Sequence, residues 1–125
     1  SGRSRRLTGR SHEVFIDFSG SRLVANFGTL QVASLARSVN LVKRRLWDLK
    51  VDRDRARDSV LMRNHELILQ SPGAGDPQVT ARQYASIQKT LESLEEQADQ
   101  EELRLRAMNT VPEIGEHLLR LEAIV

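Results

Sequence analysis

The chain has 125 residues, of which 29% are charged and only 4% aromatic. This length allows one domain, and the low aromatic content argues against a typical β-sandwich or barrel core. The absence of cysteine excludes disulfides, thiolate metal sites and cysteine nucleophiles. No apolar run approaches the roughly 18 residues of a membrane span, and no apolar stretch follows the arginine-rich start as a signal peptide requires. Because the first residue is Ser1, we expect a fragment, a processed form or a tag remnant.

The net charge of +2 hides an uneven distribution. Residues 1–70 contain 14 Lys/Arg and 7 Asp/Glu, whereas residues 71–125 contain 5 and 10. A basic half and an acidic half in one chain can pair within the molecule. The basic half can instead bind an acidic partner such as nucleic acid, an anionic membrane or an acidic protein tail.

The N-terminal part of the chain divides into an arm and a hairpin. Residues 1–12 are mostly Gly, Ser and Arg, and such a segment cannot bury enough surface to offset its ordering entropy. We therefore expect a flexible basic arm. Residues 13–28 contain two short apolar runs around Ser19-Gly20-Ser21, a pattern that predicts a β-hairpin.

A helical pattern follows the hairpin. From Val32 to Leu67, apolar residues recur at alternating spacings of three and four residues, as in the a and d positions of a heptad repeat, with Arg53 and Arg63 as two interruptions. No Gly or Pro interrupts residues 31–69. The sequence therefore predicts one long helix over about residues 30–70.

A loop and two further helices complete the predicted order. Residues 71–77 contain two Pro and two Gly, which cannot continue a helix. The heptad pattern then resumes and predicts a second helix over about residues 77–109. Thr110 and Glu113 have the spacing of a capping box, and a short apolar stripe after them predicts a third helix over residues 112–124.

Two heptad helices joined by a short loop should fold back on each other. We therefore expect a mainly all-α fold: a long antiparallel coiled-coil helical hairpin with a short third helix over residues 29–125, preceded by the small N-terminal β-hairpin. The predicted coiled-coil seam consists of Val32, Leu35, Val39, Val42, Leu46, Leu49, Ala56, Val60, Leu67, Tyr84, Ile87, Leu91, Leu94, Ala98, Leu105 and Met108.

Further apolar residues lie outside the seam of the first predicted helix, and a two-helix pair would leave them exposed. Apolar strips of this kind mark interfaces, so we expect a protein partner and a homodimer. The predicted interface residues are Leu41, Trp47, Val51, Leu61 and Ile68 of this helix, with Phe15, Phe18 and Phe27 of the hairpin.

We find no catalytic or metal-binding pattern in the sequence. His12, His65 and His117 are isolated in the sequence, and no second histidine or carboxylate stands at the spacing of a helical metal site. We therefore expect solvated histidines, no metal, no cofactor, no small-molecule substrate and no enzymatic activity.

Residues 33–49 allow an alternative interpretation, because they resemble a helix-turn-helix unit with its turn at Asn40. In that arrangement Lys43, Arg44 and Arg45 would open a recognition helix that enters the major groove of DNA. Together with the basic arm, this segment predicts a nucleic-acid-binding module. The turn lacks glycine, however, and the heptad pattern continues through Asn40 without a break.

The order of a long helix, a short loop, a long helix and a short helix resembles the tubulin-binding cofactor A family. The segment Val39-Asn40-Leu41-Val42-Lys43-Arg44 is similar to the basic start of the first helix in that family. The resemblance covers residues 30–125, and the N-terminal hairpin departs from the family pattern. It implies a small cytosolic chaperone that holds tubulin.

These observations favour a non-enzymatic helical module, and they leave two alternatives open. The first hypothesis is a coiled-coil scaffold that self-associates and mediates protein–protein assembly. The alternatives are the nucleic-acid-binding module and the chaperone. We expect an intracellular, cytoplasmic protein, with a nuclear location as the variant that nucleic-acid binding would require.

Overall fold

The computed structural model describes residues 13–56 and 62–123. In these two ranges the chain forms four strands, three α-helices and one short 3₁₀ helix. Their order is β1 (Phe18–Ser19), β2 (Leu23–Thr29), η2 (Val32–Ser34), α1 (Leu35–Arg55), β3 (Asn64–Gln70), α2 (Ala81–Gln100), β4 (Arg104–Met108) and α3 (Val111–Ala123).

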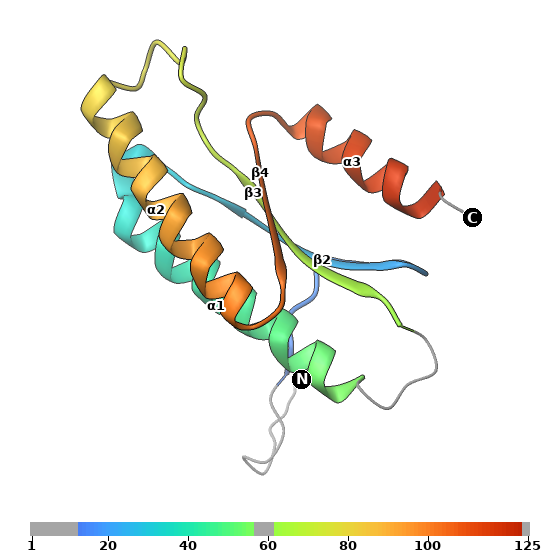
Figure 1. Cartoon of the computed structure of the whole chain (residues 1–125). Helices are drawn as coiled ribbons and strands as arrows, with labels where there is room; N and C mark the ends of the chain where they lie inside the picture. Colours follow the sequence, from blue (N-terminus) through green and yellow to red (C-terminus); the bar gives the residue numbers. More distant parts are fainter. Residues whose placement is uncertain (1–12, 57–61, 124–125) are drawn as a thin grey trace.

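The strands form a single mixed sheet with the order β1-β2-β3-β4. β1 pairs antiparallel with β2, whereas β2, β3 and β4 are parallel to one another. The helices α1 and α2 cover one face of this sheet, and α3 lies on the opposite face (Figure 1). The molecule therefore has three layers, with the sheet in the middle.

The predicted all-α fold is wrong, because the chain is a mixed α/β structure without a long antiparallel helical hairpin. The helix expected over residues 30–70 ends at Arg55, and its last part is the strand β3. The end of the second expected helix is the strand β4. Since each helix connects two neighbouring parallel strands, α1 and α2 run in the same direction (Figure 1).

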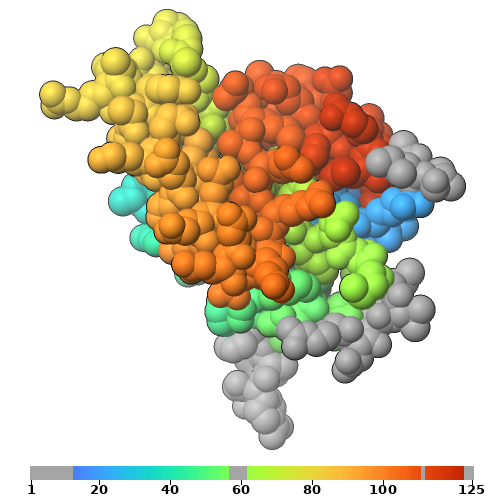
Figure 2. All heavy atoms as spheres, in the orientation of Figure 1, coloured from blue at the N-terminus to red at the C-terminus, as the bar shows by residue number. Residues whose placement is uncertain are grey.

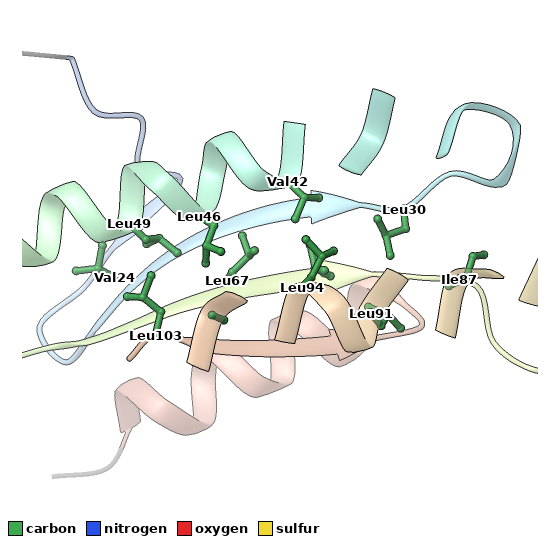
Figure 3. Packing of buried hydrophobic residues seen from close by; sticks show 12 residues of the cluster. Val24, Leu30, Val42, Leu46, Leu49, Leu67, Ile87, Leu91, Leu94 and Leu103 are labelled. Atoms are coloured by element: carbon green, nitrogen blue, oxygen red, sulfur yellow. The ribbon is translucent and has the colours of Figure 1, made fainter. Parts of the chain in front are cut away.

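The apolar stripes of α1 and α2 pack onto the sheet. Val42, Leu46 and Leu49 of α1 are buried at the predicted spacing, and the same holds for four residues of α2. Figure 3 shows these side chains converging with those of β2 and β3. A stripe that repeats every three or four residues fits a sheet as well as a second helix. The buried residues of α2 are Ile87, Leu91, Leu94 and Ala98.

The remaining residues of the predicted seam have other positions. Leu67, Leu105 and Met108 belong to strands, and Tyr84 is half-buried on α2. Val32, Leu35 and Val39 are partly buried at the margin of the core, Ala56 directly follows α1, and Val60 lies outside the described residues.

The opposite face of the sheet has its own apolar cluster. Leu23, Ala25 and Ile68 are fully or almost fully buried there. The residues that pack around them are partly buried, and three of them come from α3. These surrounding residues are Phe18, Phe27, Met108, Ile114, Leu118 and Leu121.

Parts of the sequence-based expectation hold. The predicted hairpin exists as a short antiparallel pairing of β1 with β2, although β2 also pairs with β3 and so joins the hairpin to the rest of the sheet. A third helix starts at Val111, and the capping box is confirmed, because Glu113 Oε1 accepts the Thr110 amide at 3.0 Å while the Thr110 hydroxyl accepts the Glu113 amide at 3.3 Å.

A buried amide ties the N-terminal segment to β2 and α1. Asn26 is fully buried, and its Nδ2 donates to the carbonyl oxygens of Phe15 and Arg45, both at 2.9 Å. Its Oδ1 accepts the Asp17 amide at 2.8 Å. All three partners of the Asn26 side chain are backbone groups. This buried amide therefore connects β2 to α1 and to the N-terminal segment.

Gly28 of β2 lets α1 approach the sheet closely. A β-carbon at this position would lie 2.9 Å from Val42 Cγ2 and 2.9 Å from Leu69 Cδ2. We therefore predict that Gly28→Ala lowers the free energy of unfolding by about 2 kcal/mol through overpacking. Urea denaturation measures this change, and Gly75→Ala is the control, because nothing lies within 4 Å of that position. Equal stabilities of the two variants would contradict the close approach.

Candidate interaction surface

The outer side of α1 carries large apolar side chains in contact with solvent. Leu41 is 47% exposed and Trp47 is 56% exposed. These residues are six positions apart on α1, whose buried stripe of Val42, Leu46 and Leu49 faces the sheet. Exposed tryptophan is among the residue types that dominate the energy of protein interfaces. The outer side of α1 is therefore the first candidate for a functional surface.

Basic side chains surround these apolar residues. Arg37, Lys43 and Arg44 are exposed on α1, and Lys50 Nζ lies 4.8 Å from the centre of the Trp47 ring. The tryptophan thus lies beside cations, which interact favourably with the face of its indole ring.

The neighbouring helix α2 presents the opposite charge. Its exposed acidic residues are Glu92, Glu95, Glu96 and Asp99. α1 and α2 lie side by side on one face of the sheet (Figure 1), so the basic residues of α1 and the acidic residues of α2 are on the same side of the molecule, with Gln97 and Gln100 of α2 nearer to α1. We call the exposed side chains of these two helices the α1–α2 face. This face therefore carries basic side chains on α1 and acidic side chains on α2.

A cavity of about 250 Å³ opens between the two helices, and Trp47, Leu46 and Gln97 line it. Two contacts with Glu101 connect α1 to the end of α2 beside this cavity. Lys50 Nζ lies 3.7 Å from Glu101 Oε1, and the Arg53 guanidinium donates to the Glu101 carbonyl. The cavity thus lies directly beside the exposed Trp47 side chain.

The other predicted interface residues are divided between surface and interior. Phe15 is 46% exposed and Val51 is half-buried. Phe18 and Phe27 pack into the cluster beneath α3. Ile68 is completely buried in β3 and therefore belongs to no surface. Leu61 lies outside the described residues.

The helix-turn-helix interpretation of residues 33–49 is wrong, because α1 continues through Asn40 without a turn. Of the three predicted nucleic-acid contacts, Lys43 and Arg44 are exposed. Arg45 points elsewhere: its guanidinium lies 3.9 Å from the centre of the Phe15 ring and its Nη1 lies 3.9 Å from Asp48 Oδ2. Burial raises the pKa of Asp48 above its ordinary value, although the charge of Arg45 opposes this shift.

Two of the three histidines pair with carboxylates, whereas the sequence analysis expected solvated side chains. His65 Nε2 lies 2.9 Å from Asp52 Oδ2 of α1. His117 Nε2 of α3 lies 2.5 Å from Glu66 Oε1 of β3. His12 lies outside the described residues. His65 and Asp52 are 13 positions apart in the sequence, and His117 and Glu66 are 51 positions apart. No local spacing in the sequence could therefore have revealed these pairs.

Glu66 of β3 and His117 of α3 form a pair beneath α3. Glu66 is completely buried, and Arg106 Nε lies 3.9 Å from its Oε2. This Oε2 meets no hydrogen-bond donor among the described residues. An imidazole and a carboxylate can move a proton together, but acyl transfer would also need a nucleophile beside the imidazole. The pair connects α3 with β3.

The carboxyl ends of the parallel strands are the usual ligand-binding edge of an open α/β sheet. Here a cavity of about 150 Å³ is lined by Gln70, Ser71 and Asn109. Asn109 Nδ2 donates to the Ser71 carbonyl at 3.0 Å. Among residues 13–56 and 62–123, no group of three or more His, Cys, Asp or Glu side chains could hold a metal ion.

A carboxylate at the end of α3 fixes the turn between β1 and β2. Glu122 Oε1 accepts the amide and the hydroxyl of Ser21, both at 3.0 Å, and Oε2 accepts the Arg22 amide at 3.0 Å. Desolvation would raise the pKa of Glu122, but these hydrogen bonds outweigh it and lower the pKa below its ordinary value.

The comparisons with known proteins add no relative. No protein-family model matches the chain, and the comparisons with curated proteins and with solved structures found no match. The helix order that carried the resemblance to tubulin-binding cofactor A is interrupted by β3 and β4. Within the described residues, no helix has the length and apolar character needed to cross a membrane.

Removal of His117 should leave the Glu66 carboxylate buried without its partner. We predict that His117→Ala lowers the free energy of unfolding by about 3 kcal/mol, because the Glu66 carboxylate stays buried without its partner. Glu66→Leu combined with His117→Ala should recover most of this loss. Urea denaturation of both variants measures the difference, and a single variant as stable as the wild type would contradict the role of the pair.

The Glu122 contacts predict a pH dependence of stability. A carboxyl group whose pKa is lower in the folded state stabilises the protein at pH values above its unfolded pKa. This stabilisation is lost as the pH falls through the folded pKa. Glu122→Gln should therefore lower the melting temperature at neutral pH, and the difference from the wild type should shrink in acid. Glu116→Gln is the control on the same helix, because Glu116 is exposed. If the melting temperatures of the two variants depend on pH in the same way, the prediction is wrong.

Proposed function

We propose that this protein is a non-enzymatic interaction module that associates with a second copy of itself through the α1–α2 face. The observation that carries the proposal is the exposed Trp47, which lies among basic residues of α1 and shares a cavity with Gln97 and Gln100 of α2. The function class agrees with the expectation from the sequence, but the surface is the outer side of two parallel helices and no coiled coil is involved.

Symmetry supports a second copy as the partner. A two-fold axis that runs parallel to both helices between two facing molecules places α1 of each copy over α2 of the other. Lys43 and Arg44 then lie opposite Glu92 and Glu96, because Trp47 and Gln97 line one cavity and so fix the relative height of the two helices. The basic residues of each α1 thus meet acidic residues on α2 of the other copy, and Trp47 lies near the centre of the interface.

Burial of Trp47 would supply most of the energy in this arrangement. Aromatic residues in the centre of interfaces cost about 2 kcal/mol or more when they are truncated. Charge pairs around them direct the two surfaces into one orientation and contribute less to affinity. We therefore place the decisive test at Trp47 and the test of orientation at the charges.

We predict that Trp47→Glu converts a dimer into a monomer, with a dissociation constant raised by at least about 30-fold. Light scattering after size exclusion, at several protein concentrations, measures the mass. Leu119→Glu is the matched control, because Leu119 is 73% exposed on α3, on the other side of the sheet. The proposal fails if the wild type is a monomer at every concentration, or if both variants remain dimers.

Charge reversal tests the orientation of the two copies. The variant Lys43→Glu with Arg44→Glu should be a monomer, and so should Glu92→Lys with Glu96→Lys. An equal mixture of the two should restore a dimer, because each contact then joins opposite charges again. Nucleic acid is the alternative partner of Lys43 and Arg44. A monomeric wild type that binds DNA with a steep salt dependence would replace the proposal by that function.

A further inference from the structure

β4 is an edge strand, and no other described strand lies on its outer side. It is the last strand in the sheet and pairs with β3 on one side. The Met108 carbonyl accepts the Ser71 amide at 2.9 Å and therefore points toward β3. Backbone groups of successive strand residues alternate in direction, so the N–H and C=O groups of Leu105 and Ala107 point outward.

The two ends of this outer side are closed by bonds within the chain. The Leu103 amide donates to the Ala98 carbonyl at 2.9 Å, and the Asn109 amide donates to Glu113 Oε1 at 3.2 Å. Between them, the N–H and C=O groups of Leu105 and Ala107 find no partner in residues 13–56 and 62–123. These four backbone groups match the spacing that an added strand requires. We call this stretch the β4 edge.

The β4 edge is accessible from solvent. Ala107, Arg104 and Arg106 are exposed, and Figure 2 shows orange atoms at the surface between α2 and α3, where β4 runs. The helices border the edge on the two faces of the sheet, so an extended segment would lie between them with its side chains directed alternately to each face.

The two faces beside the β4 edge differ in charge. On the face of α3, Arg104 and Arg106 of β4 are exposed, since Arg106 lies on the same side as Glu66. On the face of α2, Gln97 lines the cavity toward α1. Glu95 lies two positions before Gln97 and is therefore about 200° away from it around the helix. Asp99 follows Glu95 by one turn and lies on the same side. This flank of α2 therefore faces the free side of β4 and is acidic.

We infer that the β4 edge binds an extended segment of a different protein as a fifth strand, in which basic side chains alternate with acidic ones. The basic side chains lie against Glu95 and Asp99, and the acidic ones lie against Arg104 and Arg106. The backbone of the segment pairs with Leu105 and Ala107. Alternation along a strand sorts the two charges onto opposite faces, which is what the edge requires.

A second copy of this chain is a poor occupant of the same edge. Pairing of β4 with β4 about a two-fold axis would bring Glu95 and Asp99 of both copies together on one face. The same pairing would bring Arg104 and Arg106 of both copies together on the other face. Like charges at sheet edges are a device against such self-pairing, so the charges select a segment of unlike sequence.

The first test blocks the edge without disturbing the sheet. The probe is a nine-residue peptide of alternating lysine and glutamate, titrated at low ionic strength. Ala107→Pro removes an outward N–H group, which an edge strand tolerates, and should weaken binding about tenfold. Ala107→Ser keeps the N–H group and should bind like the wild type. Equal binding by the proline and serine variants, with both folded, would overturn the inference.

Peptide chemistry supplies an independent readout. Two peptide isomers carry backbone N-methyl groups on all lysines or on all glutamates. In an added strand the N–H groups of only one residue type point toward β4, so one isomer should lose binding and the other should keep it. The unmethylated peptide should also slow hydrogen exchange at the amides of Leu105 and Ala107. Loss of binding for both isomers, or for neither, would overturn strand addition.

Neighbouring carboxylates separate this site from the self-association surface. Glu95→Lys should weaken peptide binding at least fivefold and leave the mass of the dimer unchanged. Glu96→Lys makes the same charge change on the outer side of α2, so it should weaken the dimer and leave peptide binding unchanged. If both variants bind the peptide like the wild type, the assignment of the acidic flank is wrong, whatever the state of the dimer.

Discussion

Burial of β3 on both faces is the constraint on which the rest of the molecule depends. Five consecutive residues from His65 to Leu69 are buried, and β3 has a neighbouring strand on each side. A parallel strand in this position needs helices above and below, since both rows of side chains are apolar or paired. The two crossover helices α1 and α2 cover one face, which leaves α3 as the cover of the other. The three layers follow from this single strand.

The same constraint determines which surfaces remain available. Both crossover connections place their helices on one face and in one direction, so the basic outer side of α1 lies beside the acidic outer side of α2. Since the order of the described strands ends at β4, the sheet also has an edge at this strand. The two proposed binding surfaces are therefore consequences of the topology and of the charge difference between the halves of the chain.

The sequence predicts which residues of α1 and α2 are buried, but it does not predict that a sheet covers them. Val42, Leu46, Leu49, Ile87, Leu91 and Leu94 are buried as expected, but a stripe reveals which side of a helix is covered and not what covers it. Leu67 fits the heptad by chance; the better signal was the run Leu67-Ile68-Leu69, because three successive apolar residues suit a strand buried on both faces. For the site, the exposed Trp47 could be predicted from its position off the stripe, whereas Glu66 and His117 meet only through the fold.

The packing of α3 on its face of the sheet depends more on polar contacts than the packing of α1 and α2 on the opposite face. The sheet residues Leu23, Ala25 and Ile68 are buried, but the apolar residues of α3 that lie on them are only partly buried. Area alone therefore stabilises this helix less than it stabilises α1 or α2. Two carboxylates supply the additional contacts: Glu66 holds His117 in the middle of α3, and Glu122 holds the turn before β2 near its end. These polar contacts join β3 and the start of β2 to α3, so the central strand remains covered on both faces.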